Sequence, residues 1–156
     1  MQNTITHVNP DQTEVKIEVG DNVVIGKGVT IKSRVMLCHN VTIGARTTIG
    51  ISTVVCDSAK IGKGVRIGGL SVIGRESTIS HYATIYERCK IGHFTTIFDR
   101  ATIGEKVEIK NNVVIHRLSI ICPGVKVPEQ YVLPEKTLLV FDDISVHRLP
   151  KSPHPA

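Results

Sequence analysis

Aliphatic residues recur at every sixth position over most of this chain. The repeat begins at Val19 and continues to Leu139 without an insertion, and all 21 positions carry Ile, Val or Leu. We call these positions anchors. A period of six argues against an amphipathic helix, whose apolar positions recur every three or four residues, and the many β-branched residues favour strands. The pattern therefore predicts one short strand in every hexad.

The other positions of the hexad are also specialised. The residue four places after an anchor is mostly small or β-branched, as at Val23, Thr47 and Ser71, and the residue directly after an anchor is Gly nine times. Glycine there suits either a corner with unusual backbone angles or a close approach of two backbones. One buried aliphatic residue, one buried small residue and one corner per hexad are typical of a parallel β-helix.

This repeat resembles the hexapeptide-repeat family, whose members form left-handed parallel β-helices of triangular cross-section. The resemblance implies an all-β solenoid in which three hexads make one 18-residue coil, with about seven coils in total. At a strand spacing of roughly 4.8 Å, the prism would be about 34 Å tall. We expect an N-terminal lead-in or cap over 1–14, the β-helix over 15–144 and a Pro-containing tail over 145–156. The left hand comes from the family and does not follow from the period.

Charge and composition indicate which kinds of partner and which cellular location to expect. The net charge is +5 and the pI is near 9.1, which favours anionic partners, but the basic residues are scattered and aromatic residues make up only 4%. We therefore expect no nucleic-acid binding. There is no apolar stretch of about 20 residues and no apolar leader at the start, so we expect a cytoplasmic protein without a membrane span.

The four cysteines lack any C-x-x-C pair and are expected to be free thiols. Cys38 and Cys56 lie 18 residues apart at the same hexad position, so they stack on adjacent coils. The sequence leaves open whether they are bonded.

Several apolar residues fall at positions that point outward. They share one side of the second to fourth coils and are Met36, Ile51, Val54, Leu70 and Val72. Soluble monomers rarely leave such a patch exposed. Family members commonly form trimers with parallel prism axes, so we expect a homotrimer that buries this patch.

Histidines at outward corner positions are the main candidates for chemistry. His39 has carboxylates one coil before and after it, at Asp21 and Asp57, and His81 stacks on Asp99 in the same way. A carboxylate can fix the tautomer of an imidazole and raise its basicity, as a general base requires. We therefore take His81, Asp99 and His39 as candidate catalytic residues.

The resemblance implies an acyltransferase in which a histidine deprotonates a small hydroxyl or amine acceptor at a subunit interface, with acyl-CoA as the donor. Arg100 and Arg117 lie near His81 in the register and are candidates for binding the cofactor phosphates. Two alternatives stay open. The uninterrupted hexads and the missing acceptor domain suit a non-catalytic scaffold or docking module, so the sequence does not decide whether the protein is an enzyme.

The second alternative is a γ-type carbonic anhydrase-like protein. Members of the fold with that activity bind a divalent metal through three histidines, two of them five residues apart. No two histidines of this chain have that spacing, and a zinc site needs ligands that converge on one point. We therefore predict no metal site. The acceptor substrate is also beyond what the sequence reveals.

Overall fold

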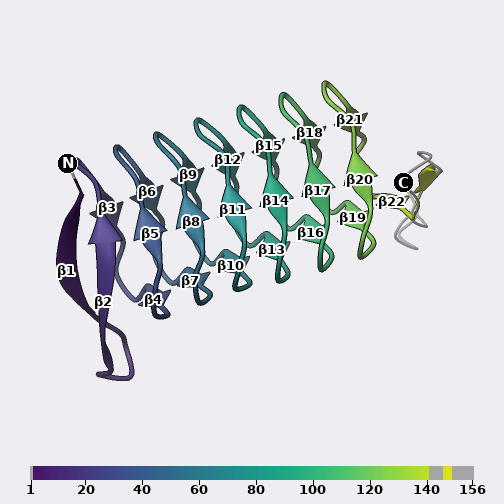
Figure 1. Ribbon diagram of the computed structural model, residues 1–156. Coiled ribbons are helices and arrows are strands. Elements are labelled where there is room, and N and C mark those ends of the chain that lie inside the picture. Colours follow the sequence, from purple (N-terminus) through teal and green to yellow (C-terminus); the bar gives the residue numbers. More distant parts are fainter. Residues whose placement is uncertain (1, 141–145, 149–156) are drawn as a thin grey trace.

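The computed structural model describes residues 2–140 and 146–148, and in these residues it is an all-β solenoid without helices. Three sheets run along the axis, parallel except for the antiparallel pairs at their ends, and successive coils lie side by side in sequence order (Figure 1). Paired strands are 18 residues apart, as in the pairing of Ile67 with Ile85. This arrangement confirms the predicted solenoid of about seven 18-residue coils.

Each sheet forms one face of the solenoid. Face A contains β1 (Asn3–Val8), β2 (Glu14–Val19), β5 (Met36–Leu37), β8 (Val54–Val55), β11 (Val72–Ile73), β14 (Lys90–Ile91), β17 (Glu108–Ile109) and β20 (Lys126–Val127). Face B contains β3 (Val24–Ile25), β6 (Thr42–Ile43), β9 (Lys60–Ile61), β12 (Thr78–Ile79), β15 (Thr96–Ile97), β18 (Val114–Ile115) and β21 (Val132–Leu133). Face C contains β4 (Thr30–Ile31), β7 (Thr48–Ile49), β10 (Arg66–Ile67), β13 (Thr84–Ile85), β16 (Thr102–Ile103), β19 (Ile120–Ile121), β22 (Thr137–Leu139) and β23 (Val146–Arg148). The AB, BC and CA corners are the turns that follow the strands of faces A, B and C.

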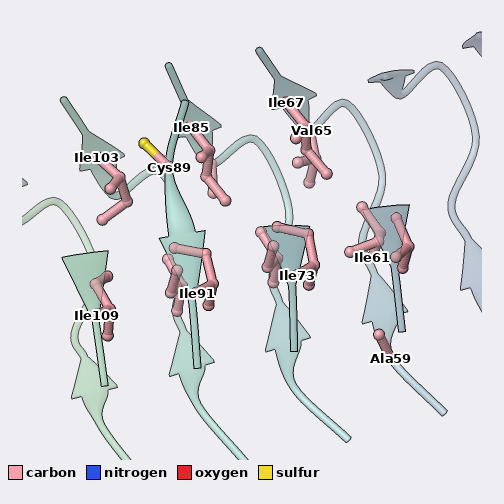
Figure 2. Close-up of a cluster of buried hydrophobic side chains, with 14 of the residues drawn as sticks. Ala59, Ile61, Val65, Ile67, Ile73, Ile85, Cys89, Ile91, Ile103 and Ile109 are labelled. Atoms are coloured by element: carbon pink, nitrogen blue, oxygen red, sulfur yellow. The ribbon is translucent and has the colours of Figure 1, made fainter. Parts of the chain in front are cut away.

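The anchors fill the interior in continuous rows. Ile67, Ile85 and Ile103 form one row along face C, opposite a second row along face A (Figure 2). Anchors from Ile31 to Leu139 are at most 3% exposed. Burial of one such side chain contributes about 1.5–3 kcal/mol, so the rows of stacked aliphatics supply the main stabilisation of the solenoid.

The structure of the corners shows whether the glycine after an anchor serves unusual backbone angles or a close approach of two backbones. Directly after an anchor, glycine allows a close approach, because a Cβ added at Gly26 would lie 2.6 Å from the backbone N of Ala45 on the next coil. The unusual backbone angles occur two places later. There the residue has positive φ at every corner from Asn22 to Lys136, yet only Gly28, Gly64 and Gly124 are glycine.

Leu70, with φ of 60°, illustrates how these corners are stabilised. A left-handed conformation costs roughly 1–2 kcal/mol for an ordinary residue. The N–H of Leu70 donates to the carbonyl of Ile51 on the previous coil at 2.8 Å, and the same bond recurs from corner to corner. The inter-coil hydrogen bonds thus continue through the turns and offset the strain.

Small polar residues form hydrogen bonds with the backbone C=O and N–H groups that remain at the corners. The buried hydroxyl of Ser77 donates to the carbonyl of Gly92 at 2.7 Å and accepts from the N–H of Thr95 at 3.1 Å. Thr47, Ser71, Thr95 and Ser119 make equivalent bonds. At these five positions a small hydroxyl residue both fits the space and bonds to the next coil, whereas on other coils Val or Ala fills the same space.

The N-terminal end carries a hairpin. β1 pairs antiparallel with β2, and Asn9 beyond it is 5% exposed. The Asn9 amide oxygen accepts from the N–H of Ile31 at 2.8 Å, and its Nδ2 donates to the carbonyl of Ile31 at 3.0 Å. His7 Nε2 lies 2.9 Å from the carbonyl of Val29. The hairpin therefore caps the edge of face C that would otherwise be open.

At the other end, β23 pairs antiparallel with β22. Apart from β23, the predicted tail at 145–156 lies outside the described residues.

Candidate functional site

The corner histidines hold consecutive coils together. His39 Nδ1 accepts a hydrogen bond from the N–H of Asp21 at 2.8 Å, and His81 Nδ1 accepts from the N–H of Lys63 at 2.9 Å. His93 Nδ1 accepts from the N–H of Arg75 at 2.9 Å. In each case the donor stands 18 residues earlier, at the same place on the previous coil.

These bonds determine the tautomer of a neutral ring. A nitrogen that accepts from an N–H carries no proton itself, so the neutral imidazole has its proton on Nε2. A general base that acts through Nε2 requires the opposite tautomer, with the proton on Nδ1. The expectation that a carboxylate orients the imidazole is therefore not met at His81, where the main-chain N–H of Lys63 takes that role.

The surroundings of His81 combine an aromatic ring with cations. It lies at the BC corner beside Tyr82, and the guanidinium of Arg100 on the next coil lies 5.5 Å from the centre of that ring. Asp99 occupies the position of His81 one coil later, but no hydrogen bond joins the two within the described residues. Arg117 Nε lies 3.9 Å from Glu135 Oε2 in an exposed ion pair, which contributes little to stability.

His39 lies at the AB corner, so it does not converge with His81 in one site on the same chain. The predicted flanking by carboxylates is confirmed: Asp21 Oδ2 lies 3.6 Å from His39 Nδ1, and Asp57 Oδ1 accepts from the N–H of His39 at 2.9 Å. Beside it, Cys38 and Cys56 are free thiols. Burial raises the pKa of both thiols, and the charge of Asp57 adds to this effect. A raised pKa disfavours the thiolate, so neither cysteine is activated as a nucleophile.

The residues of the predicted apolar patch lie on face A and at the corner beside it. Met36 pairs with Val54, and Val54 pairs with Val72, in adjacent strands of face A. Ile51 and Leu70 lie at the neighbouring CA corner and are 39% and 53% exposed.

Two surface pockets on face C were not anticipated from the sequence. One of about 340 Å³ is lined by Thr48, Arg66, Thr84 and Glu87, and one of about 260 Å³ by Thr102, Glu105, Ile120 and Pro123. Tyr86 lines both pockets and is 51% exposed. None of the predicted site residues lines either pocket. A sequence signal exists, because Tyr86 directly follows an anchor, at the position that is glycine in nine of the 21 hexads.

Aromatic residues also replace this glycine at the BC corner. Phe98 and His116 stack with ring centres 5.2 Å apart and planes 2° apart. In residues 2–140 and 146–148, no group of three or more His, Cys, Asp or Glu is placed to hold a metal ion. The same residues include no helix that could span a membrane.

Comparison with known proteins defines the repeat. The family model described as bacterial transferase hexapeptide (six repeats) matches residues 16–50. The match covers the first hexads of the repeat. No curated protein matches its sequence.

Solved structures share the solenoid fold of this chain. A hexapeptide transferase family protein from Anaplasma phagocytophilum superposes with a TM-score of 0.70 at 18% identity, over 88% of this chain and 81% of that one. The polySia-specific acetyltransferase NeuO gives 0.67 at 15% identity, over 85% and 80%. LpxA, a UDP-N-acetylglucosamine acyltransferase from Bacteroides fragilis, gives 0.54 at 17% identity, over 84% and 72%. These matches confirm the left-handed parallel β-helix fold of this chain.

Proposed function

We propose that the chain is the subunit of an oligomeric acyltransferase that moves an acyl group from acyl-CoA to a small hydroxyl or amine acceptor. The fold supports this proposal, because NeuO and LpxA carry acyl-transfer activity in their names and share the solenoid. The carrying observation is the corner of His81, where an exposed imidazole lies beside Tyr82 and Arg100.

In the reaction, the acceptor loses a proton to a base, its oxygen or nitrogen bonds to the acyl carbon, and the thioester bond breaks. The departing sulfur takes a proton and leaves as free CoA. His81 is the proposed base. It can serve only when Nε2 is free of its proton, so the hydrogen bond from the N–H of Lys63 to Nδ1 must break during the reaction.

The cations near His81 suit the donor. The guanidinium of Arg100 lies over the ring of Tyr82, and its N–H groups are donors suited to a phosphate. Arg117 can exchange its exposed partner Glu135 for a phosphate at little cost. The proposed trimer, formed through Met36, Ile51, Val54, Leu70 and Val72, would bury the apolar patch and create grooves between adjacent prisms.

A second candidate function is a non-catalytic scaffold. The specific observation in its favour is that Asp57, Asn111 and the corner histidines make the same inter-coil hydrogen bond. A histidine used in this way is a structural part, and the coils from β3 to β21 continue without interruption at the hexad period.

The test is calorimetric titration of the protein with acetyl-CoA and with free CoA, together with an assay of CoA release in the presence of hydroxyl and amine acceptors. The acyltransferase proposal expects acetyl-CoA binding that weakens in Arg100→Ala, and CoA release that is lost in His81→Asn but kept in His93→Asn. Binding or release that is the same in all variants would remove His81 and Arg100 from the site. A folded protein that neither binds acetyl-CoA nor releases CoA would favour the scaffold.

A further inference from the structure

The outermost strand of face A has a free edge. β1 is the first strand of its eight-stranded sheet and pairs only with β2 among the described residues. Figure 1 shows it at the N-terminal end of the row of coils, and no other described strand lies beyond it. At six residues it is as long as β2 and longer than the two-residue strands of the coils.

The hydrogen-bond pattern shows which residues of β1 face this edge. In an antiparallel pair, every second residue bonds to the partner strand, and the residues between point their N–H and C=O the other way. Asn9 N–H donates to the carbonyl of Thr13, which extends the register of His7 with Val15 by one bonded pair. The even-numbered residues Thr4, Thr6 and Val8 therefore direct their backbone groups outward.

β2 gives the same result independently. Its N–H groups at Glu18 and at the following Gly20 donate to the carbonyls of Val35 and Leu37 on the next coil. The odd-numbered residues of β2 consequently bond to β1, and these are the partners of Asn3, Ile5 and His7. The outer edge of β1 thus offers the backbone donors and acceptors of Thr4, Thr6 and Val8.

Proteins usually protect an edge of this kind. They place lysine or proline on the edge strand, bend it with a bulge, or cover it. β1 has the sequence NTITHV, which contains no lysine, proline, aspartate or glutamate. Its register with β2 is continuous from Asn3 to Val8, so no bulge interrupts it. Ile5 and Val8 are 37% and 52% exposed. These features favour strand addition.

We infer that β1 is an association site for β1 of a second copy, which joins two solenoids end to end through one continuous sheet. A two-fold axis generates an antiparallel pair of identical strands, as an isologous contact requires. With the axis at Thr6, Thr6 pairs with Thr6 of the second copy and Thr4 pairs with its Val8. All the outward residues are then in hydrogen-bonded pairs.

The side chains agree with this register. Thr6 against Thr6 and Thr4 against Val8 are pairs of β-branched residues, which stabilise neighbouring strands. Ile5 lies opposite His7 of the second copy, so no like charges meet when histidine is neutral. A single pair of short strands associates weakly. Several subunits held side by side present several β1 edges at one end, and the affinity between two such assemblies is then much higher than that of a single pair. This last step rests on the proposed oligomer.

The experiment measures mass by light scattering across a concentration series for the whole chain and three variants. Thr6→Pro removes an outward N–H, and Thr6→Lys places two cations at the two-fold axis. Thr42→Lys adds the same charge on exposed face B and is the control. We expect the wild type and Thr42→Lys to reach twice the mass of Thr6→Pro and Thr6→Lys, whatever the size of the smaller species.

Hydrogen exchange is the second measurement. The amides of Thr4, Thr6 and Val8 are expected to exchange slowly in the wild type at high concentration and quickly in Thr6→Lys, while Ile5 and His7 stay protected in both. Equal masses for the wild type and Thr6→Lys would overturn the inference. A doubling that survives both Thr6 substitutions would also overturn it, because the contact would then lie elsewhere. Both readouts are independent of acetyl-CoA binding, so they separate this inference from the proposed activity.

Discussion

His93 and Asn111 occupy the same corner place on neighbouring coils, and the N–H of His93 donates to Oδ1 of Asn111 at 2.8 Å. On the coil before, Nδ1 of His93 itself accepts from the N–H of Arg75 at 2.9 Å. An amide oxygen and an imidazole nitrogen thus act as the acceptor of equivalent inter-coil hydrogen bonds. This equivalence makes it feasible to separate the structural role of a corner histidine from any chemical role.

His81 can be tested in this way. His81→Asn keeps an acceptor for the N–H of Lys63, so we expect an unchanged free energy of unfolding. His81→Ala loses the acceptor at an exposed place, where water replaces it, and we expect a loss of at most about 1 kcal/mol. Denaturant unfolding of the two variants checks this. Equal stability of both variants would show that the bond contributes nothing.

Ile73 tests the register of the core. It is fully buried, whereas Val72 next to it is 39% exposed. Ile73→Asp puts an unpaired charge between stacked coils and is expected to prevent folding. Val72→Asp is the matched control and is expected to stay folded. Circular dichroism and solubility measure both, and a folded Ile73→Asp protein would contradict the assignment of the anchors.

Gly104 and Gly124 test the two uses of glycine. A Cβ on Gly104 would lie 2.6 Å from the N of Pro123, so Gly104→Ala forces two coils apart. At Gly124 nothing lies within 4 Å, but φ is +78°. Gly124→Ala therefore bears only the left-handed conformation, at about 1–2 kcal/mol. We expect the larger loss of unfolding free energy from Gly104→Ala. The reverse order would contradict the close-approach explanation.

Cys89 predicts a pH dependence of stability. Burial raises the pKa of its thiol to about 11 from an ordinary value of 9.0. Above pH 9 the unfolded chain releases this proton while the folded chain retains it, so stability that is complete below pH 9 is lost as the pH rises towards 11.

Cys89→Ser isolates this effect. Serine already occupies the equivalent corner place at Ser71, and its hydroxyl does not titrate in this range. We expect the unfolding free energy of the wild type to fall more steeply between pH 9 and 11 than that of the variant, because all other groups titrate equally in both. Parallel curves would show that the thiol is not buried.

Leu70 tests the proposed oligomer contact. Leu70→Glu places a charge in the apolar patch and is expected to reduce the mass in solution. Val132 is exposed to nearly the same extent, 52% against 53%, but lies on face B outside the patch. Val132→Glu is therefore the control and should keep the wild-type mass. A mass unchanged by Leu70→Glu would remove the patch from the interface.

The sequence pattern predicted the solenoid and its register, although not the hand of the helix. A strict period of six, with an aliphatic residue at each anchor and a small residue four places later, places every coil and predicts which residues stack 18 apart. This is why the stacking of His39 between Asp21 and Asp57 was predicted correctly. A repeat fold has this property because each residue has the same neighbours as its equivalent one coil away.

How these neighbours bond follows from the three-dimensional structure. The period predicts that His81 and Asp99 stack on adjacent coils. The backbone at the corner, however, directs the N–H of Lys63 at Nδ1 of His81. The sequence did not reveal the residues with left-handed backbone angles, because most of them are not glycine. Hydrogen bonds to another coil stabilise them. The free edge of β1 depends on which peptide groups face outward. The direction of these groups follows from the pairing of β1 with β2 and cannot be inferred from the sequence.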